Sequence, residues 1–247
     1  KISSGDALSK KEEAEWSRVL ERYDAVCKKA KAHDVAVLID AEESWMQDAC
    51  DVLITNLMII YNTEKPIVYN TLQMYRHDRL AFLEQEHKKA KRGNYFLGFK
   101  LVRGAYLEKE NERAEEKGYK SPICDTKFET DQNFNNGVHY MMDHLDCMSL
   151  FAGTHNEDSS YLLMNLMSEK KLLNNDPRIW FGQLYGMSDH ISFNLANKGY
   201  NVAKYVPFGP VKDVMPYLIR RAEENTSVAG QTGRELALIK KEKKRRK

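Results

Sequence analysis

Two adjacent arginines, Arg220 and Arg221, are the residues best suited to bind an anionic group in this sequence. Each guanidinium offers a planar fork of N–H donors that matches a carboxylate or a phosphate. On a helix, Tyr217, Arg221 and Glu224 recur at intervals of four and three residues and would share one face. Charges of this kind also occur on solvated, ion-paired helix surfaces. The segment follows an apolar run directly, which favours an anion-binding helix at the end of a strand.

Polar side chains follow six short apolar runs at the point where each run ends. In parallel βα proteins the functional site is built at the carboxyl ends of the strands. Six runs that end in this way predict one continuous ring of functional groups and favour an enzyme. The ring consists of Asp40, Glu42, Asn70, Gln73, Lys100, Arg103, Tyr106, Thr154, His155, Asn156, Gln183, Tyr185, Lys204 and Tyr205.

Three members of this ring have both a functional and a structural interpretation. Asp40 could hydrogen-bond a catalytic partner or act as a base, but it could also cap the next helix. Lys100 alternates with Phe99 and Leu101, so it would point to the opposite face, where a buried ammonium needs an anion. The alternative is a surface lysine with its charge in water. His155 could face a cofactor or cap the helix that follows it.

The spacing of apolar residues predicts strands that alternate with helices, which is the pattern of βα units on a parallel sheet. Ser9 and Glu12 predict a capping box at the start of the first helix. The expected strands span residues 35–40, 66–70, 98–103, 148–154, 179–184 and 202–206. The expected helices span residues 9–33, 44–61, 73–92, 108–117, 128–144, 158–171, 188–198 and 212–225.

The composition describes a soluble globular protein, with 30% charged residues, 42% hydrophobic residues and a net charge of +2. Residues 240–247 carry seven basic side chains and Glu242, a net charge of +6 that leaves −4 for the rest of the chain. A basic tail on an acidic body does not indicate nucleic-acid binding. We expect a frayed, solvated terminus, with contact to an anionic membrane surface as the alternative.

Several common sites are not indicated. The four cysteines form no C-x-x-C pair, so a disulfide framework is not expected. The histidines lack the spacing of a zinc site, and no metal is predicted. Neither G-x-G-x-x-G nor the P-loop pattern occurs, so a Rossmann site and a P-loop are not supported. No apolar run is long enough to cross a bilayer.

Seven segments between residues 35 and 226 together resemble, in order, the motifs of the proline dehydrogenase family. The resemblance implies a (βα)8 TIM-type barrel that binds FAD and oxidises L-proline to Δ1-pyrroline-5-carboxylate. Hydride would pass to FAD, and electrons would then pass to a membrane quinone. The segments are LIDAEES (38–44), NTLQMY (70–75), KLVRGAY (100–106), GTHNED (153–158), FGQLYGM (181–187), KYVPFGP (204–210) and YLIRRAEEN (217–225).

The resemblance also implies a role for each matching residue. Arg220 and Arg221 would clamp the proline carboxylate, and Asp40 would orient its partners in the active site. Lys100 would lie near the reactive nitrogen of the flavin and Gln73 beside the ring. The pocket around proline would be lined by Leu184, Tyr205 and Tyr217. The remaining FAD contacts would come from Val102, Arg103, Gly104, Tyr106, Thr154, His155, Asn156 and Glu224, of which Glu224 could instead steady Arg220.

This sequence departs from the family at several positions, and two other functions stay open. Many members carry Arg at the position of Lys100 and Lys at the position of Arg103. A substrate-contacting lysine of the family has no counterpart here, because Lys1 is interpreted as a false match. A 4-hydroxyproline dehydrogenase is one alternative, disfavoured because the phenol of Tyr205 narrows the pocket. A non-catalytic barrel that binds ligands without flavin is the other.

The length predicts an incomplete barrel. Six units within residues 35–206 take about 29 residues each, so eight units would exceed the 247 residues of this chain. We therefore expect one domain over residues 1–247 that holds six of eight βα units, lacks the first two strands and ends in a basic tail from about residue 236. Family members work at the cytoplasmic face of the bacterial inner membrane or, alternatively, in mitochondria. A homo-oligomer is compatible with the sequence.

Overall fold

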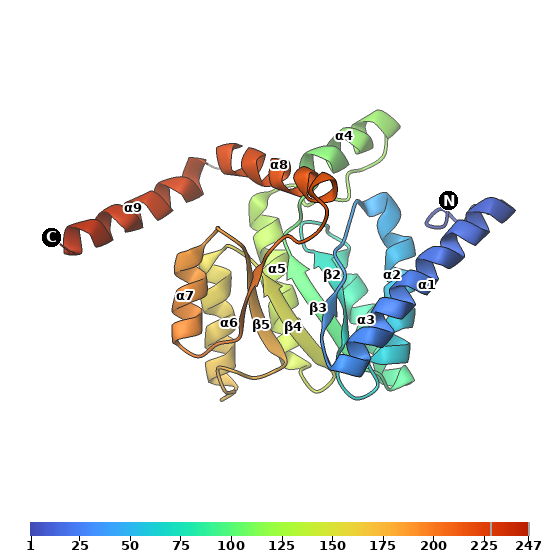
Figure 1. Cartoon of the computed structure of the whole chain (residues 1–247), viewed down its shortest axis with the longest axis horizontal. Helices are drawn as coiled ribbons and strands as arrows, with labels where there is room; N and C mark the ends of the chain where they lie inside the picture. The colour runs from blue at the N-terminus through green and yellow to red at the C-terminus, as the bar shows by residue number, and fades with distance from the viewer. Residues whose placement is uncertain (228, 247) are drawn as a thin grey trace.

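The computed structural model of the chain describes residues 1–227 and 229–246, with side chains described for residues 1–219 and 236–246. Its centre is one parallel sheet in which every strand pairs with the next along the chain. The sheet curls into a half-barrel whose edges are the first and last strands (Figure 1). The strands are β1 (Val37–Leu38), β2 (Val68–Gln73), β3 (Leu97–Val102), β4 (Met148–Gly153), β5 (Ile179–Leu184) and β6 (Val202–Tyr205).

Helices cover the convex face of the sheet, while α4 and α8 lie beyond its carboxyl end (Figure 1). The final helix, α9, extends away from the sheet. The described helices are α1 (Lys10–His33), α2 (Ser44–Tyr61), α3 (Arg79–Gly93), α4 (Leu107–Lys117), α5 (Lys127–Asp143), α6 (Glu157–Glu169), α7 (Asp189–Asn197), α8 (Val211–Ser227) and α9 (Ala229–Arg245).

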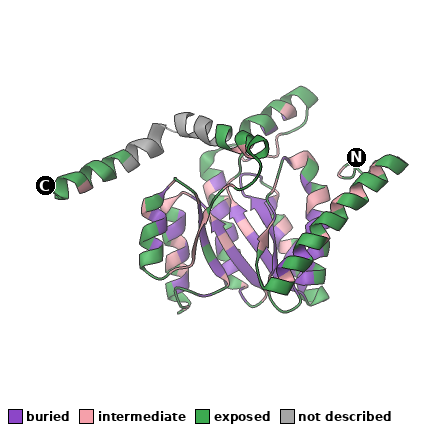
Figure 2. Ribbon diagram, in the orientation of Figure 1, coloured by how far each residue is buried: buried purple, intermediate pink, exposed green. Residues whose placement is uncertain are grey.

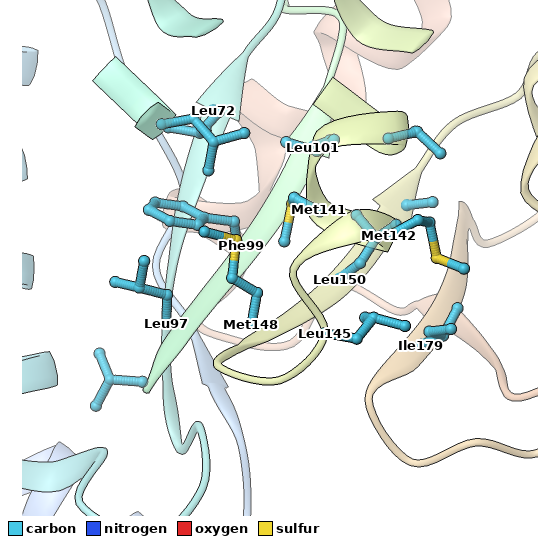
Figure 3. Close-up of a cluster of buried hydrophobic side chains, with 14 of the residues drawn as sticks. Leu72, Leu97, Phe99, Leu101, Met141, Met142, Leu145, Met148, Leu150 and Ile179 are labelled. Atoms are coloured by element: carbon cyan, nitrogen blue, oxygen red, sulfur yellow. The ribbon is translucent and has the colours of Figure 1, made fainter. Parts of the chain in front are cut away.

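The hydrophobic core lies between the sheet and the covering helices. Alternate residues of each strand point outward, so Phe99 and Leu101 of β3 and Leu150 of β4 pack against Met141 and Met142 of α5 (Figure 3). Buried residues are concentrated on the strands and on the helix faces that meet them (Figure 2). This alternation leaves the other face of each strand for the interior of the half-barrel.

On the concave face, aromatic rings of one strand lie directly against glycines of the neighbouring strand. A Cβ atom added to Gly98 of β3 would lie 2.6 Å from the ring of Tyr69 on β2, and one on Gly182 of β5 would lie 2.2 Å from the ring of Phe151 on β4. Only glycine permits an approach this close. Lys100 lies two residues beyond Gly98 and therefore shares this face.

The strands and helices expected from the sequence are present, with shifted ends and two errors. The helix expected over residues 73–92 begins only at Arg79. Pairing with β3 continues past β2, because the N–H groups of Met74 and Tyr75 donate to the carbonyls of Val102 and Arg103, both at 2.7 Å. Gln73 is therefore a strand residue. The capping box of Ser9 and Glu12 is confirmed.

The expectation of a frayed C-terminus is also wrong for the described residues, because residues 229–245 form helix α9. Leucine, lysine, arginine and glutamate are good helix formers. Glu242 pairs with Arg245 at 2.6 Å and with Arg246 at 2.7 Å, which adds support within one turn. Among the described residues, no helix is long and apolar enough to span a bilayer.

Candidate active site

The ion pair between Lys100 and Asp40 lies on the concave face at the carboxyl end of the sheet. Asp40 follows β1, and its carboxylate accepts a hydrogen bond from the ammonium of Lys100. The Lys100 side chain is 15% exposed and that of Asp40 is 56% exposed. Lys100 is thus paired with an anion inside the half-barrel, as its alternation along β3 predicts. Lys100 therefore does not take the alternative position on the surface. Asp40 does not cap the next helix, because Glu43 is the N-cap of α2.

Gln73 ties two loops together beside this pair. It is 3% exposed at the end of β2. Its amide nitrogen donates to the carbonyl of Glu42 at 2.7 Å, and its amide oxygen accepts from the N–H of Ala105 at 3.4 Å. These bonds join the loop after β1 to the turn after β3. Gln73 therefore fixes the relative positions of these two segments at the carboxyl end of the half-barrel, which we call the mouth.

Arg103 is the second cation at this edge, and protein groups bind three of its nitrogens. Nε donates to Asp131 at 2.6 Å, Nη1 to Thr154 at 2.7 Å and Nη2 to Ser159 at 2.9 Å. Burial acts to raise the pKa of Asp131, but the hydrogen bonds from Lys127 and Arg103 outweigh it and hold that pKa below its usual value. Arg103 therefore joins β3 to α5, β4 and α6.

The segment after β4 is organised by Asn156 rather than by His155. The side chain of Asn156 accepts from the N–H of Ser159 at 2.9 Å and so caps α6. The hydroxyl of Thr154 accepts from the N–H of Asn156 at 3.0 Å. His155 instead contacts the hydroxyl of Ser188 through Nδ1 at 2.9 Å, so the capping role considered for it is wrong.

The turn after β3 requires glycine. Gly104 has a φ of +129°, and a Cβ atom there would lie 2.6 Å from the ring of Tyr75. The fold itself therefore requires glycine at position 104. Two positions away, the hydroxyl of Tyr106 donates to the carboxylate of Glu42 at 2.5 Å. The side chain of Val102, the last residue of β3, lies beside Gly153 of β4.

The residues expected around the substrate meet where β5, β6 and α8 converge. Leu184 and Tyr205 are register partners at the ends of their strands. The ring of Tyr205 contacts that of Tyr217 on α8, with centroids 5.4 Å apart. The three side chains therefore lie together, on the same edge as Lys100. The side chains of Arg220, Arg221 and Glu224, which were also expected here, lie outside the described residues.

Sequence reasoning did not identify several residues that build this edge. Asp131 and Ser159, the partners of Arg103, were not assigned a role, and neither was Ser188, the partner of His155. Ser159 directly follows the GTHNED segment, three residues after an Asn, which is a capping signal that could have been used. Asp131 is the fifth residue of α5, beyond its cap, and carries no such signal.

Comparisons of the sequence with a family model and with known proteins agree with one another. The family model described as proline dehydrogenase matches residues 2–234. The chain is 38% identical over 242 residues to the carbapenem antibiotics biosynthesis protein CarD of Pectobacterium carotovorum subsp. carotovorum, covering 97% of this chain and 61% of that protein. It is 39% identical over 235 residues to mitochondrial proline dehydrogenase 1 of Homo sapiens, covering 94% of this chain and 39% of that one.

The chain therefore spans roughly two fifths to three fifths of the length of these relatives. A solved structure of proline utilization A (PutA) from Bdellovibrio bacteriovorus, inactivated by N-propargylglycine, shares the fold. The TM-score is 0.79 at 24% sequence identity, and the match covers 87% of this chain and 22% of that one.

Proposed function

This chain belongs to the proline dehydrogenase family, and on that premise we propose that it catalyses the flavin-dependent oxidation of L-proline to Δ1-pyrroline-5-carboxylate. The observation that carries the proposal is the Lys100–Asp40 pair on the concave face. It lies at the edge where Leu184, Tyr205 and Tyr217 also gather. Such an edge is where βα proteins place their chemistry.

The residues at this edge are of the types that FAD requires. A pyrophosphate needs cations and N–H donors, and the isoalloxazine ring needs hydrogen-bonding groups at its edge and apolar contacts on its faces. Lys100, Arg103 and Gln73 supply the cations and the amide, and the exposed turn at Gly104 brings backbone close. The residues proposed to hold FAD are Gln73, Lys100, Val102, Arg103, Gly104, Tyr106, Thr154, His155, Asn156 and Glu224.

When bound, FAD supplies the electron sink that accepts a hydride from the carbon next to the proline nitrogen. The chain provides orientation. Asp40 holds the ammonium of Lys100 in place, and Arg220 and Arg221 bind the proline carboxylate through their N–H forks. Leu184, Tyr205 and Tyr217 enclose the ring and exclude water from it. Fixing both ends of so small a substrate is what makes the reacting carbon accessible in one orientation.

The remaining features of the proposal concern the whole protein. We propose that two further βα units close the half-barrel into a (βα)8 barrel, which would cover the open edges of β1 and β6. The electron acceptor is a membrane quinone, and the basic residues between 240 and 246, at the end of α9 and just beyond it, favour contact with an anionic membrane surface. That membrane is a bacterial inner membrane or, as the names of the eukaryotic relatives support, a mitochondrial one.

Turnover with an artificial electron acceptor tests the substrate. Purified protein that contains this chain and FAD should oxidise L-proline in preference to 4-hydroxyproline, because Tyr205 narrows the pocket. Arg221→Met should raise the KM for proline about 100-fold while flavin stays bound, since it removes one fork of the carboxylate clamp. An unchanged KM would contradict the clamp, and faster turnover of 4-hydroxyproline would contradict the substrate assignment.

A further inference from the structure

Helix α4 is joined to the loop between β1 and α2 by a series of side-chain contacts, of which only that of Tyr106 involves a residue of the proposed FAD site. The hydroxyl of Tyr106, at the start of α4, donates to Glu42 at 2.5 Å. One turn further, Lys109 forms an ion pair with Glu43, whose side chain is buried. Both partners lie in the loop that carries Asp40 to its position.

The deepest of these contacts is made by Glu110. It is 0% exposed, and its two carboxylate oxygens accept the N–H and the hydroxyl of Ser44, each at 2.6 Å. Ser44 is the first residue of α2. Within the described part of the chain, the side chain of the N-cap, Glu43, caps no N–H of α2. Glu110 therefore acts as an N-cap supplied by another helix, where a negative charge also meets the positive end of the helix dipole.

Aromatic contacts extend the same junction outward. The guanidinium of Arg113 lies 4.4 Å from the ring centroid of Trp45, and the ammonium of Lys109 lies 5.8 Å from it. The indole is thus within cation–π distance of two cations of α4. Because cation–π contacts are modest at exposed sites, they add to the junction but do not explain the burial of a full carboxylate at Glu110.

No ion pair to Glu110 occurs among the described residues, and burying a carboxylate without one costs free energy unless hydrogen bonds replace its lost hydration. Only residues 41–43 separate Ser44 from Asp40. The same loop is held from the other side, where Gln73 donates to the carbonyl of Glu42 at 2.7 Å. Asp40 is thus placed by a short loop that is fixed at Glu42 and Ser44.

We propose that Glu110 is a positioning residue for the active site. By binding Ser44 it holds residues 41–43 and, through them, the carboxylate of Asp40 against Lys100. Its effect on turnover rests on the proposed function, whereas its effect on the loop does not. Glu110 touches neither Asp40 nor Lys100, so it acts only through the loop.

The test compares Glu110→Gln with Glu112→Gln, a matched change at an exposed position of the same helix. In flavin-free protein, amide hydrogen exchange at Ser44 should become roughly 10-fold to 100-fold faster in Glu110→Gln, because a charge-assisted hydrogen bond is lost. Exchange in β4 and α6 should not change, and Glu112→Gln should match the wild type. Unchanged exchange at Ser44 would overturn the proposal.

The same variants loaded with FAD test the catalytic consequence. In Glu110→Gln, kcat should fall between about 10-fold and 100-fold, while the KM for proline changes less than about 2-fold because the carboxylate clamp is intact. Faster exchange at Ser44 with an unchanged kcat would overturn the positioning role. If the wild-type protein neither binds flavin nor oxidises proline, the proposed function fails, and the exchange result still decides whether Glu110 holds the loop.

Ser44→Ala provides a milder variant should Glu110→Gln not fold. It removes one of the two hydrogen bonds to Glu110 and leaves the bond from the backbone N–H. We expect a fall in kcat of about 3-fold to 10-fold, again with little change in KM. A kcat equal to that of the wild type would contradict the proposal.

Discussion

Lys100 and Arg103 are two cations on the same strand end with opposite surroundings. Arg103 is bound through three nitrogens by Asp131 of α5, by Thr154, which follows β4, and by Ser159 of α6. Among the described residues, Lys100 has one partner, Asp40, and an ammonium carries three donors. Arg103 thus uses three of its five N–H donors to join elements of the fold, whereas Lys100 uses one of three, for Asp40, and each cation keeps two donors for a ligand. Both are predicted to bind the cofactor, and the structure adds a second role, within the fold, for Arg103.

The largest expected effect is on catalysis at Lys100. Lys100→Met removes the cation nearest the proposed reaction centre and should lower kcat/KM for proline about 100-fold or more. The free energy of unfolding should change little, because one partly exposed ion pair is lost. Lys170→Met, which breaks the exposed pair with Asp143 at 2.8 Å, serves as the control and should leave both quantities unchanged. A Lys100→Met variant that is stable and fully active would show that the reaction does not need the Lys100 ammonium.

The next effect is on stability at Arg103. Arg103→Met removes one hydrogen bond from each of three partly buried acceptors and should lower the free energy of unfolding by roughly 2–3 kcal/mol. Lys127→Met removes the other cation that contacts Asp131, but that lysine side chain is 79% exposed, so its loss should cost less than about 0.5 kcal/mol. Urea denaturation measures both. Equal effects would show that Arg103 does not hold the mouth together.

The smallest effect is the dependence of stability on pH through Asp131. Its pKa in the folded protein is below the ordinary value of 3.8, so the unfolded chain binds protons first on acidification. The stabilisation is therefore complete above about pH 4 and is lost as the pH falls through the lowered pKa. Between about pH 6 and pH 3, Arg103→Met should lose less stability than the wild type. The same loss in both proteins would mean that Arg103 does not lower this pKa.

Much of the fold could be predicted because local patterns determine it. Alternation along β3 places Lys100 opposite Phe99 and Leu101, and Ser9 with Glu12 marks the start of α1. The helix expected from residue 73 was misplaced because pairing with β3 carries the extended chain through Tyr75. That pairing is a tertiary contact, which no local pattern reports.

The contacts that build the site were harder to predict, because they join distant parts of the chain. Glu110 lies in LEKENERAEEK, an almost wholly polar helix in which nothing distinguishes the buried carboxylate from its exposed neighbours. Its partner, Ser44, is 66 residues away. Asp131 and Arg103 are 28 residues apart and on different elements. The motifs identify residues at the mouth, but the residues that support them are found only from the structure.

Anaerobic reduction of bound flavin by L-proline tests the central claim most directly. Protein that contains this chain should bind FAD with absorbance near about 450 nm, and L-proline without any other reductant should bleach that band. Lys100→Met should retain the band and bleach about 100-fold more slowly. Wild-type protein that binds FAD and keeps its full absorbance with saturating proline would contradict the account.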